Sequence, residues 1–208
     1  MARYTGAVCR QCRRAGEKLF LKGERCYTPK CAVEKRRKTP GDHQPRRRRA
    51  SEWGTQLREK QKARQMYGVL ERQFRTYFAH AHKIQGATGS NLLQLLERRL
   101  DNVVYRVGFA DSRAQARQYV LHGHFTVNGR KVSIPSYRVR VGEQVAWKGA
   151  SKEKPFSQDA SRTVGQRPIP AWIDVDKNAL TAVISRNPEA EDIDSKLDTR
   201  MIVEFYSR

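Results

Sequence analysis

The stretch from residue 100 to 141 constrains the fold of this chain most, because it contains a helix start, a helix end and a hairpin turn in close succession. Ser112 and Gln115 form the S-x-x-Q pattern of a capping box, which predicts a short helix over residues 113–121 that ends at Gly123. Asn128-Gly129 then lies between alternating apolar residues, a strong signal for a β-hairpin. Residues 137–141 repeat the period of two, so the stretch predicts a compact unit of one helix and short antiparallel strands.

The charge of the chain predicts a polyanionic partner. Lys and Arg total 42 against 21 Asp and Glu, a formal net charge of +21 that is extreme for an enzyme of 208 residues. The excess is uneven: residues 1–65 hold 20 basic and 6 acidic side chains, whereas residues 151–208 hold 9 and 10. Contacts with the polyanion are therefore expected before residue 151.

Nucleic acid is a simpler partner than an acidic membrane surface. No run approaches the roughly 18 apolar residues that span a bilayer, and the N-terminus lacks the apolar core of a secretory signal. The sequence also lacks the glycine-rich phosphate loop of nucleotide-binding enzymes. We therefore expect a cytoplasmic protein that binds nucleic acid, with no membrane contact and no small-molecule substrate.

All four cysteines lie near the N-terminus as Cys9, Cys12, Cys26 and Cys31, two close pairs separated by thirteen residues. Two such pairs can surround one metal ion with four thiolates, and the few apolar residues between them are too few for an unaided core. The spacing predicts a structural metal centre, with zinc favoured and a [4Fe-4S] cluster as the alternative. Two disulfides or free thiols are the other possibilities, and disulfides would require an oxidising compartment.

The remaining helices, strands and loops are predicted from the spacing of apolar residues and from the positions of Gly and Pro. Residues 34–50 form a basic arm with two prolines, and Ser51 is the expected N-cap of a helical region that Gly68 divides before about residue 85. Its expected buried stripe is Met66, Leu70, Phe74, Tyr77, Phe78, Ala81 and Ile84. Ser90 is the expected N-cap of a leucine-rich helix over residues 92–100. Strands are expected at residues 145–147, 172–175 and 180–184, with a polar loop over residues 151–170.

The sequence resembles one family, that of the fourth ribosomal protein of the bacterial small subunit, S-four. The matching motifs are residues 100–106 (LDNVVYR), 112–113, 115–118, 122–124 (HGH), 127–129 (VNG) and 134–137 (IPSY). Further matches are residues 1–4 (MARY), 57–62 (LREKQK), 67–68, 72–75 and the end 203–208 (VEFYSR). The resemblance covers nearly the whole chain and is weakest over residues 149–198.

This resemblance implies an α+β protein. We expect an N-terminal metal knuckle and basic arm over residues 1–45, and a helical domain over residues 46–97 that residues 199–208 complete. An inserted mixed α/β RNA-binding domain with a short antiparallel sheet would cover residues 98–160. A C-terminal linker with short strands would follow over residues 161–198.

The resemblance also implies a binding function without turnover. A member of this family would bind small-subunit ribosomal RNA at a multi-helix junction of the 5′ domain, nucleate subunit assembly and contribute to translational accuracy. It would contact the fifth small-subunit protein and messenger RNA near its entrance. An RNA-modifying enzyme such as a pseudouridine synthase, or a ribosome-rescue factor, can carry the same RNA-binding domain. The former would need a further catalytic domain that residues 151–208 are too few to supply.

The candidate RNA-binding residues are basic or polar side chains placed on these elements. Arg113 and Arg117 are four apart and share one helical face. Around them stand His122, His124, Asn128, Arg130, Lys131, Ser136, Tyr137 and Arg138. The earlier candidates are Arg3, Arg10, Arg13, Arg14, Arg46, Arg47, Arg48, Arg49, Arg58, Lys60, Lys62 and Arg72. Within the arginine run, alternate residues of an extended segment point in opposite directions. The resemblance implies a place for this run by the messenger entrance, so Arg47 and Arg49 would anchor to ribosomal RNA while Arg46 and Arg48 face messenger RNA. The alternative is that all four arginines make diffuse phosphate contacts.

Overall fold

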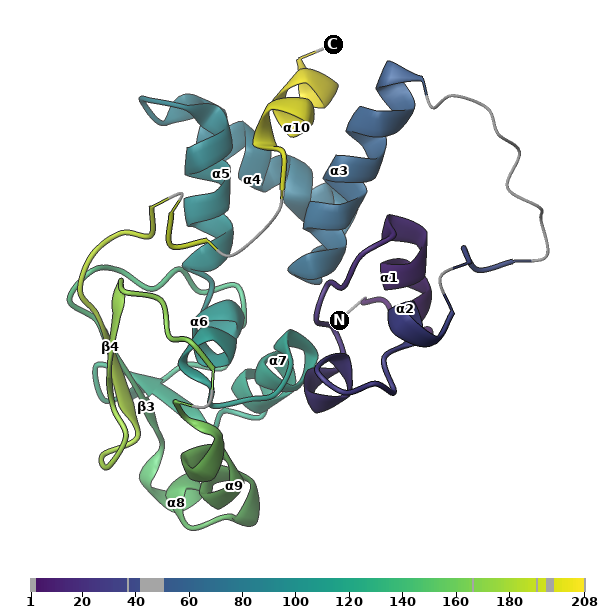
Figure 1. Ribbon diagram of the computed structural model, residues 1–208. Coiled ribbons are helices and arrows are strands. Elements are labelled where there is room, and N and C mark those ends of the chain that lie inside the picture. The colour runs from purple at the N-terminus through teal and green to yellow at the C-terminus, as the bar shows by residue number, and fades with distance from the viewer. Residues whose placement is uncertain are drawn as a thin grey trace. The chain divides into compact units, whose positions relative to one another are not determined.

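The computed structural model describes residues 3–36, 38–41, 51–165, 167–189, 191–193 and 197–207. The chain divides into two compact units, residues 1–89 with 195–208, and residues 90–194 (Figure 1). The domain boundary expected at residue 97 stays a prediction. The arginine run 46–49 lies outside the described residues, so its division between ribosomal and messenger RNA stays a prediction.

The first unit is built from helices. They are α1 Cys9–Ala15, the short 3-10 helix η1 Gly23–Cys26, α2 Ala32–Lys35, α3 Glu52–Met66, α4 Glu71–Lys83 and α10 Thr199–Tyr206. Ser51 caps α3 as predicted, since its Oγ accepts the Gly54 N–H at 3.2 Å. Gly68, with φ +63°, separates α3 from α4, which confirms the predicted division. Of the predicted stripe, Tyr77 and Phe78 are only half-buried. Leu70 and Ile84 are 38% and 46% exposed, because they lie just outside the ends of α4.

The C-terminal helix α10 packs against α3 although the two are far apart in sequence (Figure 1). Asp198 caps α10 by accepting the Arg200 N–H at 3.0 Å. The Tyr206 hydroxyl donates to Glu71 at 3.0 Å, and Gln56 donates to Glu204 at 3.0 Å. The C-terminal helix thus packs into the helical unit.

The second unit combines helices with a five-stranded antiparallel sheet in the order β2-β1-β3-β5-β4. Its strands are β1 Phe125–Val127, β2 Arg130–Lys131, β3 Gln144–Trp147, β4 Ile173–Asp176 and β5 Thr181–Ile184. Its helices are α6 Leu100–Val107, α7 Arg113–Leu121, α8 Gly149–Lys152 and α9 Pro155–Thr163, and α5 Thr88–Glu97 spans the boundary between the units. The predicted α+β class and the predicted short antiparallel sheet are both confirmed.

The core of the second unit joins these helices to the sheet. Phe125 and Trp147 are opposite each other in the β1–β3 register and their ring centroids lie 4.4 Å apart. Phe109, which follows α6, also contacts both rings. Val103 and Val120 add fully buried positions from α6 and α7. The short strands are therefore stabilised by burial under helices, because a few ladder hydrogen bonds alone would not hold them.

The predicted helix and hairpin of residues 112–131 are confirmed. The Ser112 Oγ accepts the Gln115 N–H at 3.3 Å, and the Gln115 side chain accepts the Asp111 N–H at 2.8 Å. Helix α7 then ends near Gly123, which has φ +74°. Asn128 and Gly129 both have positive φ, 47° and 78°, which is the conformation that a two-residue hairpin turn requires.

Two of the expected elements are wrong. Residues 137–141 form no strand; the backbone there makes only an isolated bridge between Arg138 and Arg99. Residues 135–137 instead cap α6, because the N–H groups of Leu100 and Asp101 donate to the carbonyls of Tyr137 at 2.8 Å and Pro135 at 3.1 Å. The same contacts explain why the leucine-rich helix stops at Glu97 and a new helix begins at Leu100.

The predicted loop over residues 151–170 is also wrong, because it contains the second half of α8 and all of α9. Pro155 occupies the first turn of α9, where a missing N–H does no harm, and Ala160 and Val164 pack into the core. Arg167 then forms an ion pair with Asp111 at 3.0 Å. The leucine-rich helix also begins at Thr88 rather than after Ser90.

The hairpin turn yields a first prediction. Replacing Gly129 by Ala should lower the free energy of unfolding by about 1–2 kcal/mol, because a Cβ at a left-handed position clashes with the chain's own backbone. No other group lies within 4 Å of the added Cβ, so the loss would be conformational. Urea unfolding followed by circular dichroism measures it. Gly149→Ala, where the surroundings are equally open, is the control and should change stability little or raise it. Equal stability of the two variants would contradict the assigned turn.

Candidate nucleic-acid interface

A buried carboxylate organises the arginines at the start of α6. Arg99 is 1% exposed and forms a two-fold ion pair with Asp101, with Nε–Oδ1 at 3.0 Å and Nη2–Oδ2 at 2.6 Å. Arg117, which projects from α7, reaches the same carboxylate at 3.2 Å. Asp101 thus joins the start of α6 to the middle of α7, and two positive charges share one buried negative charge.

A second buried carboxylate belongs to Glu97, the last residue of α5. It is fully buried and accepts two hydrogen bonds from Arg106, at 3.0 and 2.8 Å, and one from the Asn102 amide at 2.7 Å. The Asn102 Oδ1 in turn accepts the Arg113 Nε–H at 2.7 Å. The Arg113 guanidinium also lies over the Tyr105 ring, 4.5 Å from its centroid. The polar residues of the LDNVVYR motif are therefore internal, and they hold α5, α6 and α7 together.

The structure places Arg113 and Arg117 on one side of α7, as their spacing predicted, but it also gives both an internal partner. Their binding to RNA stays a prediction. The charge count could not show these partners, because Asp101 and Asn102 meet α7 only after the chain folds back.

The hairpin and the segment after it carry candidates of two kinds. His122, Asn128, Arg130, Lys131 and Arg138 are exposed, whereas His124, Ser136 and Tyr137 are half-buried. Asn128 also has a structural contact, since its Oδ1 accepts the Gln144 N–H at 2.9 Å. The Tyr137 hydroxyl donates to Glu143 at 2.9 Å. The exposed arginines and lysine of this group are the ones that could meet a phosphate without losing a contact within the protein.

His124 is a weaker phosphate candidate than its position suggested. Its Nδ1 lies 3.0 Å from the Ser151 hydroxyl, and its ring packs on Phe156. Burial lowers the pKa of His124, and the positive charge of Lys154 lowers it further. The neutral form therefore dominates at neutral pH, and a neutral imidazole contributes little to phosphate binding.

The RNA-binding candidates of the first unit are also partly exposed and partly engaged within the protein. Arg3, Arg10, Arg14, Arg58 and Arg72 are exposed, whereas Arg13 is partly buried and donates to the Lys38 carbonyl at 3.0 Å. Arg46, Arg47, Arg48 and Arg49 lie outside the described residues.

Lys60 and Lys62 are buried on α3 and already paired. The Lys60 ammonium lies 2.9 Å from both oxygens of Glu71 and 4.7 Å from the centre of the Phe205 ring. Lys62 pairs with Glu17 at 2.6 Å and with Glu59 at 3.5 Å. These contacts dock α10 and the N-terminal segment on α3. RNA contact by either lysine stays a prediction that competes with a structural role.

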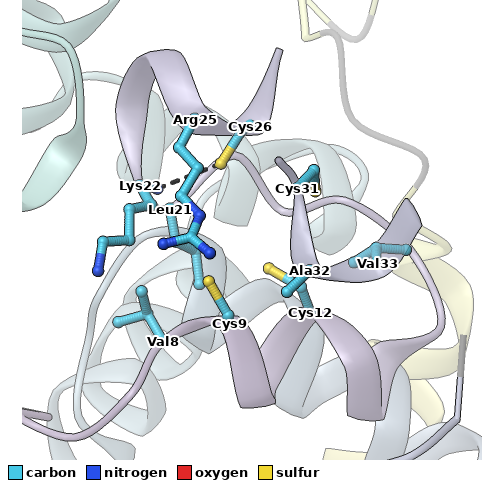
Figure 2. Close-up of a pocket in the computed structure, with 10 residues that line it drawn as sticks. All are labelled: Val8, Cys9, Cys12, Leu21, Lys22, Arg25, Cys26, Cys31, Ala32 and Val33. Atoms are coloured by element: carbon cyan, nitrogen blue, oxygen red, sulfur yellow. Dashed lines mark hydrogen bonds between the residues drawn. The ribbon is translucent and has the colours of Figure 1, made fainter. Parts of the chain in front are cut away.

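All four cysteines line one small cavity of about 10 Å³ in the first unit (Figure 2). Cys9 and Cys12 come from α1, Cys26 ends η1 and Cys31 precedes α2, and the last three are buried. Burial raises the pKa of the Cys12 and Cys26 thiols. The Lys22 N–H opposes this at Cys26, since it donates to the sulfur at 3.4 Å. Among the described residues, no three cysteine, histidine or acidic side chains are placed so that they could hold one metal ion together. His80 and His82 are exposed on α4.

Together, a small α+β unit with an exposed basic hairpin and a net charge of +21 define a nucleic-acid-binding protein. Of the helices in the described residues, none is both long and apolar enough to span a bilayer. Residues 3–97 match the family described as "Ribosomal protein S4/S9 N-terminal domain", and residues 98–145 match the "S4 domain".

Relatives match over the full length of the chain. It is 58% identical to the small ribosomal subunit protein uS4 of Heliobacterium modesticaldum and 54% identical to that of Pelotomaculum thermopropionicum, with 100% of both chains covered in each comparison. It is 57% identical to the protein named uS4A of Symbiobacterium thermophilum, again with full coverage. The chain therefore belongs to the uS4 family of small ribosomal subunit proteins.

The buried network yields the second prediction. Asp101→Ala should lower the free energy of unfolding by about 3–5 kcal/mol, because Arg99 would keep a buried charge without its carboxylate. Urea unfolding of the full chain measures the loss. Asp159→Ala is the matched control, since its ion pair with Arg162 is 3.8 Å long and both side chains are more than 70% exposed. That control should stay within about 0.5 kcal/mol of the wild type. Equal effects of the two substitutions would show that the buried pair does not hold the unit together.

Proposed function

We propose that this chain is a structural protein of the small ribosomal subunit that binds ribosomal RNA directly. The observation that carries the proposal is the identity of 54–58% over the full length to proteins named as small-subunit uS4. These relatives are ribosomal proteins, which are structural rather than catalytic. An RNA-modifying enzyme with the same domain is therefore not favoured.

The distribution of exposed charge supports RNA binding in both units. The first unit exposes Arg10, Arg14 and Arg58, and the second exposes Arg130 and Lys131 at the hairpin. Each phosphate that such a side chain neutralises releases counterions, so binding draws its affinity from electrostatics and weakens with salt. Backbone contacts of this kind position a protein on RNA without reading base sequence.

The finer role rests on the family resemblance. We infer that the RNA site is a multi-helix junction of the 5′ domain, and that binding there nucleates assembly of the subunit. Two compact units, each with its own core and exposed cations, suit a protein that holds several RNA helices at once. A contact with the fifth small-subunit protein, a place near the messenger entrance and a contribution to accuracy belong to the same proposal.

The third prediction tests RNA binding. Replacing both Arg113 and Arg117 by Ala should weaken binding of the full chain to small-subunit ribosomal RNA. The slope of log K against log salt should fall by about one for each lost phosphate contact. Filter binding at several salt concentrations measures both quantities. Because both arginines have internal partners, urea unfolding must first show that the variant is folded at the assay temperature. An unchanged affinity and slope in folded protein would remove these two residues from the interface.

We also propose that the cysteines hold one structural metal ion. Four thiols around one cavity, three of them buried, provide the donor set that zinc prefers. Zinc is favoured over a [4Fe-4S] cluster, because four cysteines in two close pairs are a common structural zinc set and no redox role is required. Bound zinc would supply no reaction here. It would join α1, η1 and α2, whose apolar core is otherwise small, and the Lys22 N–H would help to stabilise the Cys26 thiolate.

The fourth prediction concerns this metal. Cys26→Ser should release the metal and loosen residues 3–36, while the second unit remains folded. Elemental analysis with an absorption spectrum measures the metal, and hydrogen exchange measures the local loosening. Iron and sulfide in a brown protein would show that the cysteines hold a [4Fe-4S] cluster and not zinc. Metal-free wild-type protein, purified anaerobically without chelators, would refute the proposal.

A further inference from the structure

A hollow of about 410 Å³ in the second unit is lined by three arginines. Its lining residues are Leu95, Arg98, Tyr137, Arg138 and Arg140. Arg138 and Arg140 flank the fully buried Val139. In an extended segment, residues two apart leave the backbone on the same side, so both side chains turn toward this hollow. Both are exposed, whereas Arg98 is half-buried at its base.

The third arginine is held in place by the backbone. The Arg98 Nε–H donates to the Val139 carbonyl at 2.9 Å, and the Val139 N–H donates to the Arg98 carbonyl at 2.9 Å. This reciprocal pair fixes the Arg98 guanidinium next to the segment that carries the other two arginines. Holding a cation in place before the ligand arrives reduces the entropy lost on binding.

The charge around this hollow is unbalanced. Among the described residues, no carboxylate forms an ion pair with any of these three guanidinium groups, in contrast to Arg99, Arg106 and Arg117. The neighbouring Glu143 is already engaged, because its oxygens accept the Tyr137 hydroxyl and the Arg140 N–H, each at 2.9 Å. Burial lowers the pKa of Arg98, repulsion from Arg138 and Arg140 lowers it further, and the negative charge of Glu143 opposes this shift in part. Three cations held together against their repulsion favour an anion between them.

We propose that Arg98, Arg138 and Arg140 form a pre-organised site for one phosphate of the ribosomal RNA backbone. This inference rests on the proposed function. Planar guanidinium groups bind phosphate oxygens through paired N–H donors, which suits them to this ligand better than lysine. The volume lies within the range of about 300–1,000 Å³ of small-ligand sites, so a nucleotide with its phosphate can enter. Arg98 and Arg140 were not among the candidates of the sequence.

The fifth prediction compares two double variants of the full chain. Arg138→Ala with Arg140→Ala removes the two exposed members of the site. Arg162→Ala with Lys177→Ala removes two exposed positive charges elsewhere in the same unit. Filter binding to small-subunit ribosomal RNA over a salt series gives affinity and slope. We expect the first variant to bind roughly tenfold more weakly and to lose about one unit of slope, and the control to match the wild type.

Each outcome has a distinct meaning. If the wild type does not bind this RNA, the proposed function fails. If the wild type binds and the two double variants behave alike, the proposed function stands and the phosphate site is overturned. Arg98→Lys keeps the charge but loses the planar fork, so partly weakened binding with an unchanged slope supports a pre-organised site. If inorganic phosphate shifts the Arg98 side-chain NMR signal while RNA binding of Arg138→Ala/Arg140→Ala equals the control, the site serves free phosphate and not RNA.

Discussion

The buried Asp101 carboxylate is the point on which the second unit depends. It forms ion pairs with Arg99, the residue just before α6, and with Arg117 of α7, and it lies in the first turn of α6, shortly after α5 ends. Glu97 repeats the arrangement with Arg106 and Asn102. Because removal of either carboxylate would leave a buried cation unpaired, the helices and the segment that caps α6 are held in one arrangement. The three-arginine hollow lies next to this network, because Arg98 directly precedes Arg99 and holds the segment around Val139.

The high positive charge of the chain therefore consists of two populations. Arg99, Arg106, Lys60 and Lys62 are neutralised inside the protein and contribute to its stability. The exposed cations, together with the three around the hollow, remain for a polyanion. A net charge of +21 describes both populations at once, so it predicts the partner but not the contacts.

Local signals predicted the elements that local chemistry forms. The capping box of Ser112, the Asn128-Gly129 turn and the break at Gly68 were all confirmed, because backbone sterics and nearby donors decide them. The elements that were wrong depend on distant partners. Residues 137–141 look like a strand but make only an isolated bridge, and the carbonyls of Pro135 and Tyr137 cap α6. Residues 151–170 look like a loop but contain α9, whose Ala160 packs into the core of the second unit.

The sequence by itself determined the class of partner, the α+β character, the hairpin, the cysteine set and the family resemblance. The class of partner, the hairpin and the cysteine set follow from charge, period and spacing, whereas the resemblance follows from matching motifs and implied the α+β class. Only the tertiary structure decided which arginines are internal and which are exposed. Arg98 and Arg99 are neighbours with the same side chain, yet one lines an open hollow and the other is buried against Asp101. The physical reason is that a guanidinium is neutralised by whatever carboxylate the fold brings within a few ångströms, and chain folding, not sequence distance, sets that proximity.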